Sequence, residues 1–239
     1  MIYPRVIGHR GGGALTPENT LAGLRLAARL GCRGVEFDTQ LAADGVPVLM
    51  HDRTLQRTTS GRGRVAAMTS GALARLDAGR RHHPAFAGEP LPKLDAALRL
   101  CAALGLWANV EIKPGPGQDA ATGRVVARLA AAAGCQLLLS SFSSAALCAA
   151  AAEADDLPRA LLVKAIPPDW CERLAQTGAL ALHAAARGLD PAALRAVRDA
   201  GFPLACYTVN RREDAERLFA MGVCAVFTDR PDLWPSAEM

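Results

Sequence analysis

The chain has 239 residues, of which 51% are hydrophobic, and a formal net charge of +4. This length suits one domain spanning residues 1–239, and the small charge gives little reason to expect a nucleic-acid partner. The 7 cysteines are scattered without a Cys-x-x-Cys pair, which argues against a disulfide framework and a zinc ribbon. No apolar run approaches the roughly 18 residues of a membrane span, and residues 1–5 lack the features of a signal peptide. We therefore expect a cytoplasmic protein without a membrane span.

Short apolar runs alternate with alanine-rich helical patterns along the whole chain. Strands are predicted near residues 5–9, 34–38, 46–50, 106–112, 136–140, 159–163, 179–183, 204–209 and 223–228. Helices are predicted near residues 18–30, 93–104, 118–133, 143–153, 168–176, 191–200 and 211–221. Strands that alternate with helices indicate βαβ units and a parallel sheet. The predicted fold is therefore α/β, a (β/α)₈ TIM barrel.

One of the nine predicted strands is not needed for the barrel. The gap between residues 38 and 46 is too short for a crossover helix and contains Asp44-Gly45, a strong hairpin signal. Residues 46–50 are therefore predicted to form an extra hairpin strand after the second barrel strand. With a two-residue turn, Asp38 would lie directly across from His51.

Polar residues gather at the predicted carboxyl ends of the barrel strands, where barrel enzymes carry their chemistry. They are His9, Glu36, Asp38, Glu111, Lys113, Ser140, Tyr207 and Asp229. Because Glu36 and Asp38 are two residues apart on one strand, both side chains point to the same face. Together with Glu111 they form an all-oxygen set that suits Mg²⁺ or Ca²⁺. Salt bridges to arginines are the alternative explanation, and zinc is a further one because His9 is close.

Two histidines and two cations complete the predicted site. His9 and His51 are the candidate acid and base, because a histidine transfers protons near neutral pH. Arg10 and Lys113 would balance the charge of three carboxylates, one divalent cation and a phosphodiester. The other histidines have no acidic partner nearby in the sequence and are expected to be structural or exposed; they are His82, His83 and His183.

Two further patterns are weaker. Residues 53–83 contain seven arginines and one aspartate, so this stretch either frames the mouth of the site and attracts anions or is only a solvated face. The run Gly11-Gly12-Gly13 could bring backbone N–H groups to a phosphate, but there is no complete phosphate-binding or dinucleotide-binding motif.

The ordered motifs of this chain resemble those of the glycerophosphodiester phosphodiesterase family over nearly the whole length. They are Gly8-His9-Arg10-Gly11, Pro17-Glu18-Asn19-Thr20, Val35-Glu36-Phe37-Asp38, Asp44-Gly45, His51-Asp52, Glu111-Ile112-Lys113, Ser141-Phe142, Tyr207-Thr208-Val209-Asn210 and Thr228-Asp229-Arg230-Pro231. The resemblance implies a barrel related to the phosphoinositide phospholipases C, in a compact bacterial form. It also implies metal-dependent hydrolysis of glycerophosphodiesters to an alcohol and sn-glycerol 3-phosphate, a step of lipid and glycerol metabolism.

The resemblance assigns roles to residues that the sequence already singled out. The family's histidine pair falls on His9 and His51, its metal carboxylates on Glu36, Asp38 and Glu111, and its phosphate-contacting cations on Arg10 and Lys113. Phe142 and Tyr207 are expected to contact the substrate. Tyr207 stands where many members have tryptophan, so the preferred alcohol group is left open. The expected partner is a small glycerophosphodiester, and a homodimer is possible.

The chemistry that the resemblance suggests begins with the glycerol hydroxyl beside the phosphoester, whose pKa a bound metal would lower. This hydroxyl would attack phosphorus, with His9 as base and His51 as acid; the reverse assignment is nearly as good. A cyclic phosphate would form and then be hydrolysed, and direct attack by water is the alternative.

Two other functions are compatible with the same barrel. One is action on lysophospholipids or another phosphodiester, which a longer apolar groove near Phe142 and Tyr207 would favour. The other is a non-catalytic metal-binding scaffold. A scaffold is expected to lack a histidine or a carboxylate of the set, and none is missing here.

Overall fold

Eight parallel strands close into a barrel in the computed structural model, which describes residues 3–234. The strands are β1 (Val6–Gly8), β2 (Gly34–Leu41), β3 (Pro47–Leu49), β4 (Trp107–Ile112), β5 (Leu137–Ser141), β6 (Arg159–Val163), β7 (Ala181–Ala185), β8 (Leu204–Tyr207) and β9 (Ala225–Thr228). The helices are α1 (Leu21–Arg29), α2 (Ser70–Leu73), α3 (Leu94–Leu104), α4 (Asp119–Ala131), α5 (Ser144–Glu153), α6 (Trp170–Thr177), α7 (Pro191–Asp199) and α8 (Arg212–Ala220). The barrel closes where β1 pairs with both β2 and β9. The prediction of a (β/α)₈ barrel with one extra strand is confirmed.

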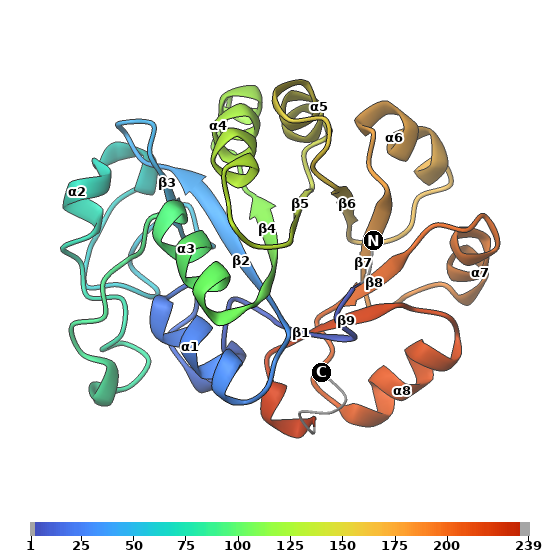
Figure 1. The fold of residues 1–239 in the computed structure, drawn as a ribbon, viewed down its shortest axis with the longest axis horizontal. Helices are drawn as coiled ribbons and strands as arrows, with labels where there is room; N and C mark the ends of the chain where they lie inside the picture. Colours follow the sequence, from blue (N-terminus) through green and yellow to red (C-terminus); the bar gives the residue numbers. More distant parts are fainter. Residues whose placement is uncertain (1–2, 235–239) are drawn as a thin grey trace.

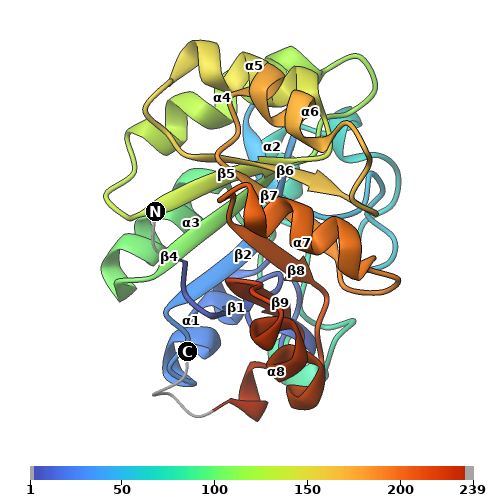
Figure 2. The ribbon, with the colours of Figure 1, turned by 90° about the vertical axis from the view of Figure 1, so that its right-hand side faces the viewer.

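The helices cover the outside of the barrel, and the strands they enclose are buried (Figures 1 and 2). Three of the helices around the barrel, α1, α5 and α7, begin at residues whose side-chain oxygens accept a backbone N–H of the first turn, namely Thr20, Ser143 and Asp190. These are the stretches whose alanine-rich patterns predicted helices. None of the helices between residues 3 and 234 combines the length and the apolar run needed to cross a bilayer.

The interior of the barrel is divided into an apolar part and a polar end. Alanines from four neighbouring strands lie fully buried inside it, at positions 160, 181, 205 and 225. The space that they leave is filled by larger side chains, among them Trp107 and Phe227. The carboxyl ends of the strands are left for polar residues.

The hairpin forms as expected, but its register differs from the prediction by one residue. β3 runs antiparallel to β2 outside the barrel, with Thr39 paired to Leu49 and Gln40 to Val48. Accordingly, the N–H of Met50, rather than that of His51, donates to the Asp38 carbonyl at 3.0 Å. The cause is a three-residue loop: the N–H of Ala42 donates to the Val46 carbonyl, and Gly45 (φ +75°) takes the left-handed conformation that such a loop needs.

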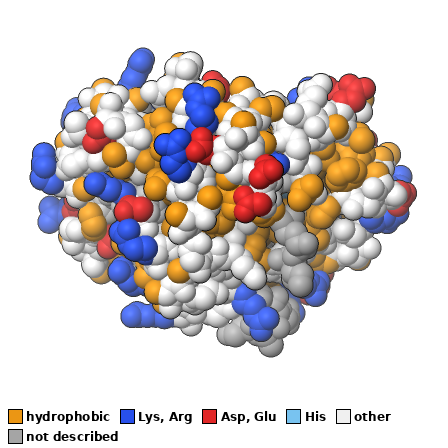
Figure 3. Space-filling model, turned by 45° about the horizontal axis from the view of Figure 1, so that its top comes forward, with side chains coloured by type: hydrophobic (Ala, Val, Ile, Leu, Met, Phe, Trp, Pro, Cys, Tyr) orange, Lys and Arg blue, Asp and Glu red, His pale blue; other side chains and the backbone are white. Residues whose placement is uncertain are grey.

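Residues 52–90 form a separate lobe beside the barrel, at the left in Figure 1. A small apolar core of its own holds the lobe to the hairpin, and it includes Leu55, Val65, Leu73, Val48 and Met50. Figure 3 shows several basic side chains along the left-hand edge of the molecule, the side on which the lobe lies. The arginine-rich stretch therefore belongs to a packed element next to the carboxyl end of the barrel.

Candidate active site

Three carboxylates from two strands meet at the carboxyl end of the barrel. Glu36 and Asp38 project from β2, and Glu111 projects from β4, where it is paired in register with Asp38. Each offers one oxygen, and these oxygens all lie within 4.8 Å of one another. The structure therefore brings together the predicted oxygen cluster.

The cluster has the electrostatics of a cation site. Burial, followed by repulsion from Asp38, raises the pKa of both Glu36 and Glu111 above the usual range. The Oε1 atom of Glu36 is buried and has no hydrogen-bond partner among residues 3–234. An open oxygen among three crowded carboxylates fits a hard divalent cation, because Mg²⁺ and Ca²⁺ take oxygen ligands.

A reciprocal pair of hydrogen bonds holds Asp38 in place. Asn19 Nδ2 donates to Asp38 Oδ2, and the N–H of Asp38 donates to Asn19 Oδ1, both at 2.9 Å. Asn19 has a φ of +57°, and its N–H donates to the carbonyl of Arg10, which has a φ of +51°. A left-handed conformation is uncommon outside glycine, so the surroundings must hold both residues in it.

The two predicted cations lie on opposite sides of Asp38. Arg10 Nε lies 3.7 Å from Asp38 Oδ2, and Lys113 Nζ lies 3.3 Å from Asp38 Oδ1. Lys113 also donates to Glu111 at 3.1 Å, and the N–H of Arg10 donates to Glu36 Oε2 at 2.8 Å. Burial raises the pKa of Asp38, but Lys113, together with His51 and Arg10, outweighs burial and keeps that pKa below the usual value.

His9 leaves β1 beside the cluster and is hydrogen-bonded to Asp229, which follows β9. The two side chains meet at 2.6 Å through Nδ1, while His9 Nε2 faces Glu36 at 3.9 Å. Asn210 fixes Asp229 by accepting its backbone N–H and donating to Oδ2. Burial lowers the pKa of His9, but the hydrogen bond to Asp229 and the charge of Glu36 outweigh it, so that pKa is raised.

His51 lies just beyond the hairpin strand and has a carboxylate partner of its own. Its Nδ1 lies 2.8 Å from Asp52 Oδ1. Since each histidine uses Nδ1 to donate to a carboxylate, each keeps Nε2 for a substrate. Burial lowers the pKa of His51, and the Asp38 and Asp52 carboxylates do not offset this effect.

Gln40 holds the segment that carries His51. Its buried side-chain amide donates to three successive carbonyls, those of Met50 at 2.8 Å, His51 at 3.1 Å and Asp52 at 2.7 Å. His51 is therefore fixed although it lies outside the paired part of β3.

Two hollows open on either side of the cluster. One, of about 590 Å³, is lined by His9 and Arg10 and reaches the lobe. The other, of about 430 Å³, is lined by His51, Lys113 and Phe142. Each hollow therefore contains one histidine and one cation of the predicted set.

The two predicted aromatic residues differ in position. Phe142 is 46% exposed and forms part of the wall of the smaller hollow. Tyr207 packs edge-to-face against Phe142, with ring centroids 6.2 Å apart, and donates its hydroxyl to the Val163 carbonyl at 2.7 Å. Tyr207 thus supports the wall that Phe142 presents.

The weaker sequence patterns have structural explanations. The N–H groups of Gly11 and Gly13 donate to the carbonyls of Glu36 and His9, so neither is free for a phosphate. His83 is exposed, whereas His183 is fully buried inside the barrel.

Sequence reasoning assigned no role to several residues that build the site. Asn19, Gln40, Asp52, Asn210 and Asp229 position the predicted residues without belonging to the predicted set. Asp229 is among the polar residues that the sequence places at strand ends, and Asn19 and Asp52 stand inside motifs, but nothing in the sequence assigns any of the three a partner. Nothing in the sequence marks Gln40.

A parallel barrel with carboxylates, two carboxylate-bound histidines and two cations at its carboxyl end defines a class of phosphodiester-cleaving enzyme. The pattern of the glycerophosphoryl diester phosphodiesterase family matches residues 9–233, and the chain belongs to this family of hydrolases. A glycerophosphodiester phosphodiesterase of Caldanaerobacter subterraneus is 33% identical over 95% of this chain and 94% of its own length.

Solved structures show the same relationship. An Oleispira antarctica phosphodiesterase in complex with the product sn-glycerol 3-phosphate superposes with a TM-score of 0.93 at 35% identity, covering 96% of this chain and 94% of that chain. A glycerophosphodiester phosphodiesterase of Agrobacterium tumefaciens has a TM-score of 0.78 at 28% identity, covering 98% of this chain and 100% of that chain.

Proposed function

We propose that this protein hydrolyses glycerophosphodiesters to an alcohol and sn-glycerol 3-phosphate, with a divalent cation and two histidines. The observation that carries the proposal is the oxygen cluster of Glu36, Asp38 and Glu111, set between two hollows that each contain one histidine and one cation. The product-bound Oleispira antarctica relative supports the same product here.

Glu36, Asp38 and Glu111 would hold the cation, which we propose to be Mg²⁺ or Ca²⁺. The open Oε1 of Glu36 and the all-carboxylate donor set fit either ion. When bound, such a cation supplies charge neutralisation at the phosphate and lowers the pKa of a coordinated hydroxyl. It would also relieve the repulsion among the three carboxylates.

Arg10 and Lys113 would bind the phosphate. Both lie next to Asp38, one at the edge of each hollow, so a phosphate over the cluster would have a positive charge on either side. The two ester arms of the substrate would then extend into the two hollows. Phe142 would contact the arm in the smaller hollow, with Tyr207 behind it.

His9 and His51 would transfer the protons from Nε2. Their pKa values shift in opposite directions, upward for His9 and downward for His51, as suits one acid and one base. Without a bound cation these shifts favour His9 as the acid and His51 as the base, the second of the two assignments that the sequence leaves open. A cation on Glu36 would lower the pKa of His9 by repulsion, while the hydrogen bond to Asp229 would still raise it.

The test is release of glycerol 3-phosphate from glycerophosphocholine and glycerophosphoethanolamine, with lysophosphatidylcholine as a third substrate. We expect release from the two glycerophosphodiesters, loss of release in excess EDTA, and recovery on adding Mg²⁺ or Ca²⁺. Release that continues at full rate in EDTA contradicts the metal requirement. Faster turnover of lysophosphatidylcholine would favour the lysophospholipid alternative. The single domain, the cytoplasmic location and the homodimer stay predictions.

A further inference from the structure

We infer that Arg57, on the lobe, is a positioning residue that ties the His51 side of the site to the Arg10 side. Its guanidinium bridges Asp52, which holds His51, and Glu18, which holds Arg10. This inference rests on the proposed function and adds a residue to which that proposal gives no role.

The bridge consists of four hydrogen bonds from one guanidinium. Toward Asp52, Arg57 donates from Nε to Oδ2 at 2.6 Å and from Nη2 to Oδ1 at 3.0 Å. Toward Glu18, it donates from Nη1 to Oε2 and from Nη2 to Oε1, both at 2.7 Å. Such paired bonds fix the angle as well as the distance between the partners, which a single charge cannot do.

Each carboxylate at the ends of the bridge also holds a residue of the proposed machinery. Asp52 Oδ1 accepts from both Arg57 and His51 Nδ1, so it sets the proton position and the orientation of the imidazole. Glu18 Oε1 accepts from both Arg57 and Arg10 Nη1, the latter at 3.0 Å. Arg57 therefore acts at one remove from His51 and from Arg10.

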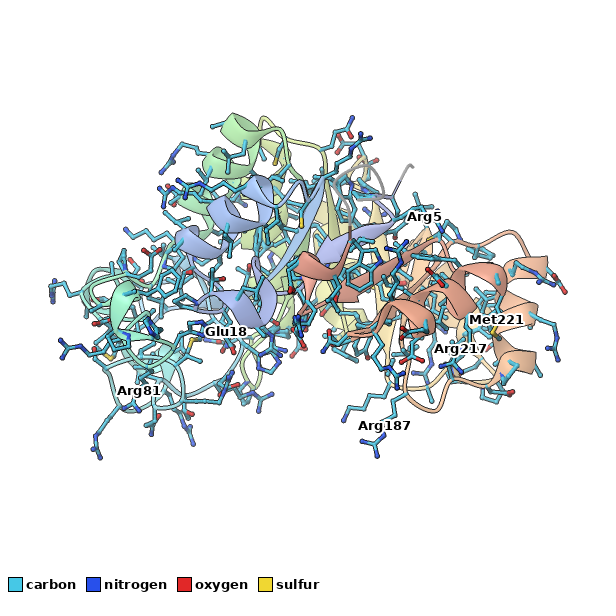
Figure 4. The ribbon with its side chains drawn as sticks, turned by 90° about the horizontal axis from the view of Figure 1, so that it is seen from below. Arg5, Glu18, Arg81, Arg187, Arg217 and Met221 are labelled. Carbon is cyan, nitrogen blue, oxygen red and sulfur yellow. The ribbon has the colours of Figure 1, made fainter. Side chains whose placement is uncertain are left out.

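The bridge joins two segments of the chain that lie on different parts of the fold. Glu18 belongs to the segment between β1 and α1, whereas Arg57 and Asp52 belong to the lobe. Figure 4 shows Glu18 between the barrel and the outer part of the lobe, where Arg81 is labelled. Glu18 and Arg57 line the larger hollow together with His9 and Arg10, so the bridge forms part of its wall.

The contacts distinguish Arg57 from an ordinary surface arginine. Its side chain is 47% exposed, and a single ion pair at that exposure would contribute little. A planar fork between two carboxylates is a network, and networks are the exception to that rule. The same contacts, Glu18 first and then Asp52, raise the pKa of Arg57 further above its usual value, so the fork keeps its charge.

The experiment compares Arg57→Gln with Arg62→Gln, a matched control that removes an equal charge from an exposed lobe position lining none of the described hollows. For Arg57→Gln we expect kcat to fall about tenfold, as for other lost outer contacts to active-site groups, and KM to rise several-fold because Arg10 is less well held. For Arg62→Gln we expect both constants to stay within about twofold. Equal losses in both variants, or an unchanged Arg57→Gln, overturn the inference.

Double variants separate positioning from simple loss of folded protein. If Arg57 acts through Asp52, Asp52→Asn added to Arg57→Gln should lower kcat little beyond the larger single loss. Multiplied losses overturn the link. A purely structural role would reduce the amount of active protein and leave KM unchanged. If Arg57→Gln does not fold, Arg57→Lys is tested instead. A lysine can bind only one of the two carboxylates at a time, so it should not restore the bridge. Wild-type kcat and KM in Arg57→Lys would therefore also overturn the inference.

A binding measurement keeps this test apart from the test of the proposed function. Calorimetric titration with glycerol 3-phosphate and Mg²⁺ should show weaker binding in Arg57→Gln than in wild type, and no change in Arg62→Gln. A wild type that turns over no glycerophosphodiester would contradict the proposed function alone, since the titration still compares the variants. Equal affinities in Arg57→Gln and wild type would contradict the bridge to Arg10.

Discussion

At the amino end of the barrel the buried guanidinium of Arg159 donates through its Nη atoms to four backbone carbonyls, whereas at the carboxyl end three carboxylates crowd together with one oxygen left open. Arg5, also at the amino end, lies 4.2 Å over the ring of Phe219. In Figure 4 it is on the opposite side of the molecule from Arg81 and Arg187. The Nη atoms of Arg159 are thus satisfied by backbone carbonyls, whereas Glu36 Oε1 at the other end has no hydrogen-bond partner among residues 3–234.

The two ends of the barrel therefore differ in whether their buried charges mainly affect stability or function. A buried charge stabilises the fold only when its partners are supplied; the Nη atoms of Arg159 have theirs, whereas its buried Nε has no hydrogen-bond partner among residues 3–234. Glu36 and Glu111 lack full compensation, which is a cost to folding that is useful only if a cation binds. Changes at the carboxyl end should therefore alter activity with little loss of stability, and changes at the amino end should do the reverse.

The largest expected effect is at the carboxyl end. His51→Ala should lower kcat by about 10²–10⁴-fold, the range for loss of an acid or base. Its free energy of unfolding should stay within about 1 kcal/mol of wild type, because the side chain is 32% exposed and its backbone is held by Gln40. Glycerol 3-phosphate release and urea denaturation measure the two quantities. A variant that loses stability in step with activity would contradict the division between the ends.

Arg159→Met tests the amino end. Loss of the guanidinium leaves the carbonyls of Ala154, Leu157 and Gly178 without this donor, so we expect the free energy of unfolding to fall by about 3 kcal/mol. kcat of the folded fraction should not change. Denaturant midpoints and active-site titration provide the measurement, and a fall in kcat of tenfold would show that the two ends are coupled.

His183 gives a pH test of the barrel interior. It is fully buried, its Nε2 is hydrogen-bonded to the Tyr3 hydroxyl at 3.0 Å, and burial lowers its pKa from 6.5 to about 3. Below pH 6.5 the unfolded chain takes up a proton that the folded protein does not, so this contribution to stability is complete above pH 6.5 and is lost progressively down to about pH 3.

At pH 5 the loss should be about 2 kcal/mol relative to pH 8. His183→Gln keeps a side-chain amide that can hydrogen-bond the Tyr3 hydroxyl and removes the titration. The variant should therefore lose about 2 kcal/mol less than wild type between pH 8 and pH 5 in denaturant titrations. Parallel pH profiles for the two proteins would show that His183 is protonated in the fold.

Tyr207→Phe should have the smallest effect. It removes the hydrogen bond to the Val163 carbonyl but keeps the edge-to-face contact with Phe142. We expect a loss of about 1 kcal/mol in stability and a kcat within about twofold of wild type. A large change in kcat would move Tyr207 from the support of the wall into direct contact with substrate.

The sequence was sufficient to predict the barrel and the meeting of the three carboxylates, because both follow from local periodicity. Each parallel strand ends at the same edge of the barrel, so strand-end residues such as Glu36 and Glu111 had to meet. The hairpin register could not be read in the same way: Asp44-Gly45 predicts a turn, but whether the loop has two or three residues depends on the backbone conformation of Gly45.

The supporting residues were harder to predict for a different reason. The contacts of Gln40 and Arg57 depend on how the lobe packs against the hairpin. The periodicity of the sequence does not predict that packing. Asp229 has a clear position at a strand end, but its partner His9 is 220 residues away in sequence. Long-range pairs of this kind become apparent only in the structure of the closed barrel.

The contact between His9 and Asp229 also has a consequence for biosynthesis. Of the strands described here, β1 is synthesised before the others and β9 after them, and this hydrogen bond joins the segments that follow these two paired strands. A nascent chain that has not reached residue 229 already contains the three-carboxylate cluster, His51, Arg10 and Lys113. Its His9, however, has no Asp229 carboxylate to orient it. Full activity should therefore begin only when β9 has paired with β1 and closed the barrel. Turnover could then be used to detect the completed fold.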